Sequence, residues 1–136
     1  MPIHSDLDPL QEVIRTKLTN PLTLEDIRRH LQTLHDSHAG TYPELVDARD
    51  VSGLELSGGE LRLLAWAART TFGLASPANR AVVVKGERAV TSARFVAVLM
   101  AGSVRLGVFE DENDAERWLE QRKQQALPPS AKRPAV

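Results

Sequence analysis

Ser57, Gly58 and Gly59 are the residues of this chain best placed to do chemistry. They lie in the stretch GLELSGGELRLLA, directly before a helical pattern. Two glycines leave the first amides of a helix uncovered, and a helix N-terminus attracts anions, so this turn is a candidate phosphosite or anion-binding turn. The same residues also form a good helix start, because Ser57 and Glu60 match a capping box. The Walker and GxGxxG patterns of nucleotide sites are both absent, which favours the helix start.

The histidines offer a second type of chemistry, metal binding. His30, His35 and His38 fall on one predicted helix, but their spacing places His30 off the face that the other two share. No carboxylate is placed to complete a zinc site, which needs three or four ligands. The sequence therefore predicts solvated surface histidines, no metal and no cofactor, with His4 in a flexible start.

Enzymatic chemistry lacks an assembled set of groups in this sequence. Ser57 has no GxSxG context and no histidine near it in the chain. Asp47, Arg49 and Asp50 lie at the carboxyl end of a predicted central strand, the edge where open α/β sheets bind ligands, but an ion-paired loop is the simpler interpretation. The prediction is that the protein is no enzyme; a hydrolase or transferase using Ser57 or Asp47 is the remaining alternative.

Two predicted helices carry a second apolar stripe that an amphipathic helix does not need. Helical spacing places Leu63, Trp66, Phe95 and Val98 on the sides that face away from the sheet, with Arg94 at the rim. Exposed apolar surface marks an interaction site. The alternative is that the two helices bury these residues against each other. The predicted partner is an unidentified protein or a second copy in a homodimer; a small apolar ligand in a groove beside the sheet is the second hypothesis.

Strands alternate with helices along most of the chain. Periodicity predicts strands at 12–19, 44–48, 80–85 and 103–110, and helices at 23–40, 57–72, 86–102 and 111–125. This βαβαβαβα order predicts an α/β fold with a four-stranded, mostly parallel or mixed sheet and helices packed on it. We expect one domain over 1–126 and a disordered, proline-rich tail at 127–136. Whether a short segment near Ile3 adds another strand stays open.

Composition limits the class of protein. The chain has 136 residues, 42% of them hydrophobic, with 17 basic and 18 acidic side chains. This balance provides no field for attracting nucleic acid. There is no cysteine, and no apolar run approaches the ~20 residues that span a bilayer. We therefore expect a cytoplasmic protein without a signal peptide, a nucleic-acid partner or membrane insertion.

Four blocks of the sequence carry a resemblance to a known family. The blocks are PLTLEDIRRHLQTL, YPELVDARDV, RAVVVK followed by ARF, and LGVFEDENDAERWLEQ. From about Leu10 to Gln124 the chain resembles the SpoIIAA-like, STAS-type family, and within it an uncharacterised bacterial branch. The resemblance implies a non-catalytic regulatory module that binds other proteins.

The same resemblance implies a role for the serine turn. In the anti-sigma-factor antagonists of the family, a serine in an Asp-Ser-Ser-Gly turn is phosphorylated by a partner kinase. Aligned with that turn, Ser57 takes the position of the phosphoacceptor and Gly58 that of the glycine. Glu55 and Leu56 depart from the pattern, because Glu55 is longer than aspartate and Leu56 replaces the first serine.

Overall fold

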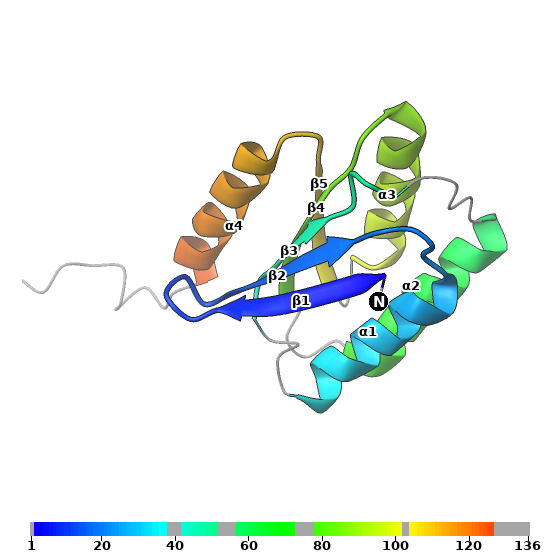
Figure 1. Ribbon diagram of the computed structural model, residues 1–136, viewed down its shortest axis with the longest axis horizontal. Coiled ribbons are helices and arrows are strands. Elements are labelled where there is room, and N and C mark those ends of the chain that lie inside the picture. Colours follow the sequence, from blue (N-terminus) through cyan, green and yellow to red (C-terminus); the bar gives the residue numbers. More distant parts are fainter. Residues whose placement is uncertain (1, 38–41, 52–56, 73–77, 102–103, 127–136) are drawn as a thin grey trace, which may run out of the picture.

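The protein, described by a computed structural model, has a central sheet with helices on both faces (Figure 1). The structure describes residues 2–37, 42–51, 57–72, 78–101 and 104–126. The strands are β1 (Ile3–Asp8), β2 (Val13–Leu18), β3 (Glu44–Asp47), β4 (Ala78–Val83) and β5 (Val104–Phe109). The helices are α1 (Leu24–Asp36), α2 (Gly58–Phe72), α3 (Glu87–Leu99) and α4 (Glu112–Ala126).

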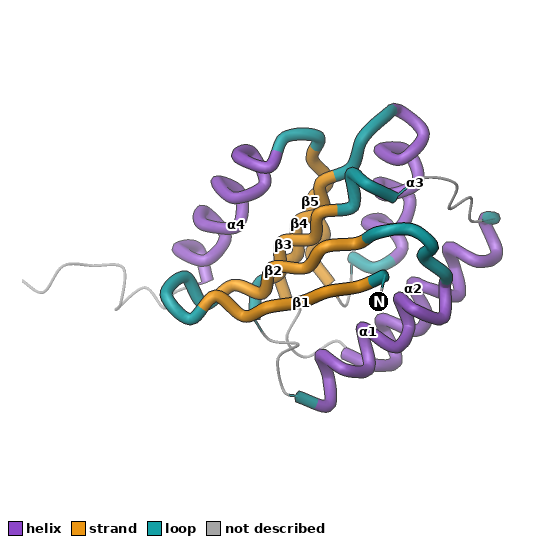
Figure 2. Tube along the Cα trace, in the orientation of Figure 1, coloured by secondary structure: helices purple, strands orange, loops and turns teal. Residues whose placement is uncertain are grey.

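The five strands are ordered β1-β2-β3-β4-β5, with β1 antiparallel to β2 and all the other neighbours parallel. From β2 to β5 the chain always moves to the next strand in the same direction. Right-handed crossovers therefore place α1, α2 and α3 on one face of the sheet. Helix α4 follows the last strand and covers the opposite face, as Figure 2 shows.

Each face of the sheet has its own hydrophobic core. The larger cluster lies under the three crossover helices and comprises Leu31, Leu61, Leu64, Ala65, Ala68, Val96, Met100 and Val104. The smaller cluster lies under α4 and comprises Leu45, Ala81, Val83, Ala115 and Leu119. Strands β3 and β4 lie inside the sheet and supply Leu45, Ala81 and Val83 to the smaller core. In the predicted valine run, Val83 and Val84 are buried and Val82 is half-buried.

The start of α1 shows why the helix begins where it does. The backbone N–H of Asp26 donates to Oγ1 of Thr23 over 3.1 Å, and the N–H of Thr23 donates to Oδ2 of Asp26 over 2.9 Å. The two bonds satisfy two backbone donors that a helix start otherwise leaves unpaired. The capping box predicted at Thr23 is thus confirmed.

The sheet has a fifth strand that the four-stranded prediction leaves out. Strand β1 pairs with β2 from Ile3↔Leu18 to Asp8↔Val13, and His4 lies inside it rather than in a flexible start. Asp8 closes the hairpin by accepting bonds from the amides of Leu10 and Gln11. The prediction was one strand short because β1 is an edge strand whose side chains are mostly exposed, so it lacks the apolar pattern of a buried strand.

Gly107 in β5 allows two aromatic rings to lie directly on the sheet. Phe109 of β5 and Trp118 of α4 pack against each other with ring centroids 5.7 Å apart and ring planes tilted by 55°. A Cβ atom at Gly107 would lie 2.7 Å from the Phe109 ring and 3.1 Å from Trp118. The contact between α4 and β5 therefore depends on the absence of a side chain at this position.

We expect Gly107→Ala to lower the free energy of unfolding by about 1–3 kcal/mol, because both rings must move out of their packed positions. Denaturant unfolding followed by circular dichroism measures the change. Gly59→Ala is the matched control: the only atom near its added Cβ is the Ser57 hydroxyl oxygen at 3.8 Å, and alanine is the better helix former. A Gly107→Ala protein as stable as the wild type would contradict this account of the α4 contact.

Some predictions concern segments for which no structure is given. The tail at 127–136, His38, and Glu55 with Leu56 lie outside the described residues. Within the described ranges, none of the helices combines the length and apolar character needed to cross a bilayer.

Candidate interaction site

The apolar stripes predicted on α2 and α3 are exposed in the structure. The exposed fraction is 58% for Leu63, 63% for Trp66, 38% for Phe95 and 75% for Val98. Arg94 is exposed as well. These five residues are called the α2–α3 surface below. The alternative that the two helices bury the stripes against each other is therefore wrong.

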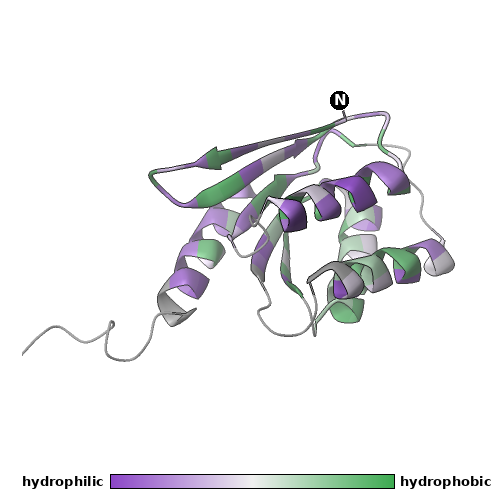
Figure 3. Cartoon of the chain, turned by 90° about the horizontal axis from the view of Figure 1, so that it is seen from below, coloured by the Kyte–Doolittle hydropathy of each residue, from purple (hydrophilic) through white to green (hydrophobic). Residues whose placement is uncertain are grey.

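The opposite sides of the same helices make the core. Leu61, Leu64 and Ala68 of α2 and Val96 of α3 are buried in the larger hydrophobic cluster. Figure 3 shows that α2 and α3 are richer in hydrophobic colour than α1, which is mostly hydrophilic. Two helices that are apolar on both sides use one side for the core and leave the other in contact with solvent.

A hydrogen bond joins the two helices at the edge of this surface. Nη2 of Arg69 on α2 donates to the main-chain oxygen of Leu99 at the end of α3 over 3.0 Å. Leu99 follows Val98 in the chain, and Arg69 lies one helical turn after Trp66. The apolar residues of the two helices therefore belong to neighbouring elements and not to distant parts of the fold.

The serine turn begins α2 as a capping box. The Glu60 N–H donates to Oγ of Ser57 over 3.1 Å, and the Ser57 N–H donates to Oε1 of Glu60 over 3.2 Å. Gly58 and Gly59 are exposed, and nothing lies within 4 Å of a Cβ built at Gly58. The helix-start interpretation of Ser57 is confirmed; its role as an anion site or phosphosite stays a prediction.

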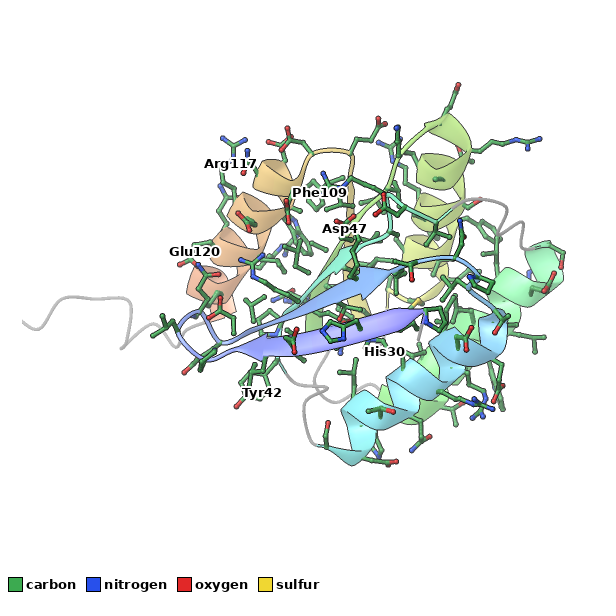
Figure 4. All side chains as sticks on the ribbon, in the orientation of Figure 1. His30, Tyr42, Asp47, Phe109, Arg117 and Glu120 are labelled. Carbon is green, nitrogen blue, oxygen red and sulfur yellow. The ribbon has the colours of Figure 1, made fainter. Side chains whose placement is uncertain are left out.

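The charged loop after β3 is an ion-pair network. Oδ2 of Asp47 lies 2.9 Å from Nη2 of Arg49 and 3.1 Å from Nζ of Lys17, which also contacts Asp50 at 2.7 Å. The Arg49 guanidinium holds the pKa of Asp47 well below its usual range. In Figure 4, Asp47 lies at the carboxyl end of its strand. A carboxylate paired with two cations is a poor base, so the ion-paired loop describes this site better than catalysis.

A buried polar cluster between α1 and the sheet is the part of the molecule that the sequence interpretation missed. Glu44 is 2% exposed, and its Oε1 accepts a bond from Nη1 of Arg80, which is 4% exposed, over 2.7 Å. Its Oε2 accepts from His30 over 2.7 Å and from the hydroxyl of Thr16. Ser5 extends the chain of bonds to the edge strand through Thr16.

His30 is therefore not a solvated surface histidine, and that prediction is wrong. Only 13% of its side chain is exposed, because α1 turns it toward β3, where its Nε2 lies 2.7 Å from the Glu44 carboxylate. His35, five residues later on a different face of α1, is exposed as predicted. Burial raises the pKa of Glu44, but the hydrogen bond from His30 and the charge of Arg80 outweigh it, so the net pKa lies below its ordinary value. Glu44 is consequently an ionised, fully bonded group.

A groove lies on the opposite face of the molecule, between α4 and the hairpin of β1 and β2. It is a depression open to solvent, with a volume of about 740 Å³. Its apolar lining comes from Leu10, Val13, Pro43, Leu45 and Leu119, and polar residues such as Arg117 and Glu120 complete the wall. The second sequence hypothesis places a ligand groove against the apolar helical surface. This groove is lined by none of the α2–α3 residues, so the two sites are separate.

Metal ligation finds no support among residues 2–37, 42–51, 57–72, 78–101 and 104–126. No group of three or more histidine, aspartate or glutamate side chains is placed there to hold an ion.

The comparisons with known proteins establish the fold. The structure is similar to the crystal structure of an uncharacterized protein of the DUF3478 family with a SpoIIAA-like fold from Shewanella loihica PV-4. The TM-score is 0.58 and the sequence identity 22%, over 86% of this chain and 91% of the other. No protein-family model matches the sequence, and no curated protein does. At this identity the likeness concerns the fold, so the chain has a SpoIIAA-like α/β fold, with five strands where the sequence predicts four.

Proposed function

We propose that this SpoIIAA-like domain is a non-catalytic interaction module that docks the α2–α3 surface on a partner protein. The observation that carries the proposal is the exposure of Trp66, Leu63 and Val98 on helices whose other sides already fill the core. Aromatic residues such as Trp66 and Phe95 are typical anchors of protein interfaces. In the Asp47 loop, Asp47 is paired with Arg49, and in the Glu44 cluster, Glu44 is paired with Arg80. Carboxylates that are already paired fit a binding module better than an enzyme.

A photo-crosslinking experiment in the cell tests this function. A p-benzoyl-phenylalanine at Val98 replaces a 75% exposed side chain without touching the core. We expect a discrete crosslinked species from this position. The same group at Arg117, which is exposed on α4 at the opposite face, is the matched control and should give none. Equal crosslinking from both positions, or none from Val98, would contradict docking by this surface.

Ser57 is the residue at which we propose this docking to be regulated. Phosphorylation would add about −2 charge at the first turn of α2, where the helix dipole favours an anion. The added charge favours the helix but repels an acidic partner. The resemblance of the ELSG turn to the phosphorylated turn of SpoIIAA-like regulators supports the same residue.

We expect protein purified from its host to carry an additional mass of roughly 80 Da that Ser57→Ala removes. Ser57→Asp keeps a side-chain oxygen for the cap and adds a charge, so it should weaken the Val98 crosslink. Ser57→Ala cannot be phosphorylated, so it should strengthen the crosslink relative to the phosphorylated wild type. A wild-type protein that is never modified would contradict regulation at Ser57 without affecting the docking proposal.

A small apolar ligand is the second candidate, favoured by the groove beside α4. Its volume of about 740 Å³ falls in the range of small-molecule sites, and its lining includes Val13, Leu45 and Leu119. Native mass spectrometry of protein from the host would then show a monomer with an additional mass, which Val13→Trp removes by filling the groove. A monomer of unmodified mass would contradict this candidate.

A further inference from the structure

We propose that the partner of the α2–α3 surface is a protein that presents an apolar strip bordered by acidic side chains, and not a second copy of this chain. This inference rests on the proposed docking function and names the chemistry of the partner. It follows from the charges that surround the apolar anchors.

The two helices are basic although the chain is not. Over the whole sequence, acidic residues outnumber basic ones by 18 to 17. The charged residues within α2 and α3 are Arg62, Arg69, Arg88 and Arg94, against Glu60 and Glu87. Glu60 is also turned back toward the start of α2, where its carboxylate accepts the Ser57 N–H. The local charge of the surface is therefore positive.

Three of the arginines border the apolar anchors. Arg62 lies four residues before Trp66, and Arg69 lies three residues after it. The two arginines and the tryptophan between them therefore share one side of α2. Arg94 precedes Val98 by four residues and has the same relation to it on α3. The bond from Arg69 to the Leu99 carbonyl holds that guanidinium between the two helices. Apolar side chains with guanidinium groups on their flanks match a partner with carboxylates around its own apolar strip.

The same charges disfavour a second copy as the occupant. A two-fold interface brings the same patch of both subunits together. Arginines at the border would then lie close to arginines of the other subunit, and like charges across an interface are strongly unfavourable. An anionic membrane would also attract arginines. A protein is favoured because the basic residues of α2 and α3 are all arginines with no lysine among them, and protein interfaces are enriched in arginine and aromatic residues and depleted of lysine.

Two defined peptides test the inference on the full chain. Both are synthetic amphipathic helices with the same stripe of leucine and phenylalanine; one is flanked by glutamate and the other by lysine. Fluorescence anisotropy measures their dissociation constants at 50 and 500 mM NaCl. We expect the glutamate peptide to bind at least about tenfold more tightly at low salt, with the preference nearly lost at high salt because the charges are screened.

Charge reversal assigns the preference to the surface. The double variant Arg62→Glu/Arg94→Glu should invert the order of the two peptides, and Trp66→Ser should weaken binding of both. Arg29→Glu/Arg105→Glu, at exposed positions of α1 and β5 outside both the α2–α3 surface and the groove, is the control that changes the net charge by the same amount, and it should leave the order unchanged. Inversion by this control would mean that only net charge matters, which overturns the inference.

The other possible results of these experiments also distinguish an acidic protein partner from the alternative occupants of the surface. Equal affinities for both peptides, lost in Trp66→Ser, would overturn the acidic border while docking stands. Failure of the glutamate peptide to bind below 1 mM would overturn the inference, and the Val98 crosslink would judge docking separately. Dimerisation in sedimentation that Trp66→Ser abolishes would assign the surface to a second copy. Tighter binding to phosphatidylglycerol vesicles than to the glutamate peptide, lost in the double reversal, would assign it to a membrane.

Discussion

Replacing Glu44 by leucine is expected to lower the free energy of unfolding by about 3–5 kcal/mol, the usual cost of removing one partner of a buried ion pair. Arg80 is 4% exposed, and its bond to Glu44 Oε1 is 2.7 Å long. Without the carboxylate, the guanidinium remains in the core next to an apolar side chain. His30 and Thr16 lose the same acceptor. Such a loss is a large part of the total stability of a domain, which is about 5–15 kcal/mol.

A second variant separates the lost charge pair from lost packing. In Glu44→Met/Arg80→Met both charges disappear and two flexible apolar side chains fill the space, so we expect most of the stability to return. Denaturant unfolding at pH 7 compares the two proteins with the wild type, and Glu44→Gln provides a milder single change if the leucine variant does not fold. A double variant as unstable as Glu44→Leu, or a leucine variant within 1 kcal/mol of the wild type, would contradict the ion-pair account.

The helices predicted from local sequence pattern agree with the structure, because the interactions that start and orient them join residues close together in the chain. Thr23 and Asp26 cap α1 through atoms three residues apart, and the Ser57 cap works in the same way. The 3.6-residue period of α2 places Trp66 opposite Ala68, so the exposure of one and the burial of the other follow from a single register. The exposed stripes could be predicted for this reason.

The Glu44 cluster could not be predicted in the same way, because its members come from different strands. Glu44 and Arg80 are 36 positions apart, and they meet only because β3 and β4 pair in the register Glu44↔Arg80. His30 reaches the same carboxylate from a helix. A charged residue at the first position of a predicted strand resembles an ordinary exposed end. The one sequence signal is that Arg80 also opens a run of valines, where a charge needs a buried partner.

The groove beside α4 depends on tertiary structure as well. Leu10 in the hairpin turn and Leu119 in α4 line it together, and the hairpin exists only because β1 pairs with β2. An edge strand with alternating charges has little apolar pattern, since neither of its faces is fully covered. The sequence analysis therefore left out both the strand and the groove for one reason: the weak apolar pattern of β1.

Acid is expected to destabilise this protein because it protonates the buried carboxylate of Glu44. The pKa of Glu44 lies below its ordinary value of 4.5, and that of Asp47 below its ordinary value of 3.8. A carboxyl with a lower pKa in the folded state binds fewer protons there than in the unfolded chain. Its contribution to stability is therefore complete above the unfolded pKa and is lost as the pH falls toward the folded one.

We thus expect the free energy of unfolding to stay nearly constant with respect to these two groups from pH 7 to about pH 5, and then to fall steeply below about pH 4.5. Denaturant titrations at each pH measure it. Four groups around Glu44 and Asp47 set the slope: His30 from α1, Arg80 from β4, Lys17 from β2 and Arg49 from the loop after β3. In Glu44→Met/Arg80→Met the slope should be shallower, because the proton uptake of Glu44 is lost, while Asp47 and Glu25, whose pKa values are also lowered, still take up protons. An equal slope in both proteins would mean that Glu44 is not ionised against Arg80 in the fold. Charges on the surface, rather than the cluster under α1, would then cause the sensitivity to acid.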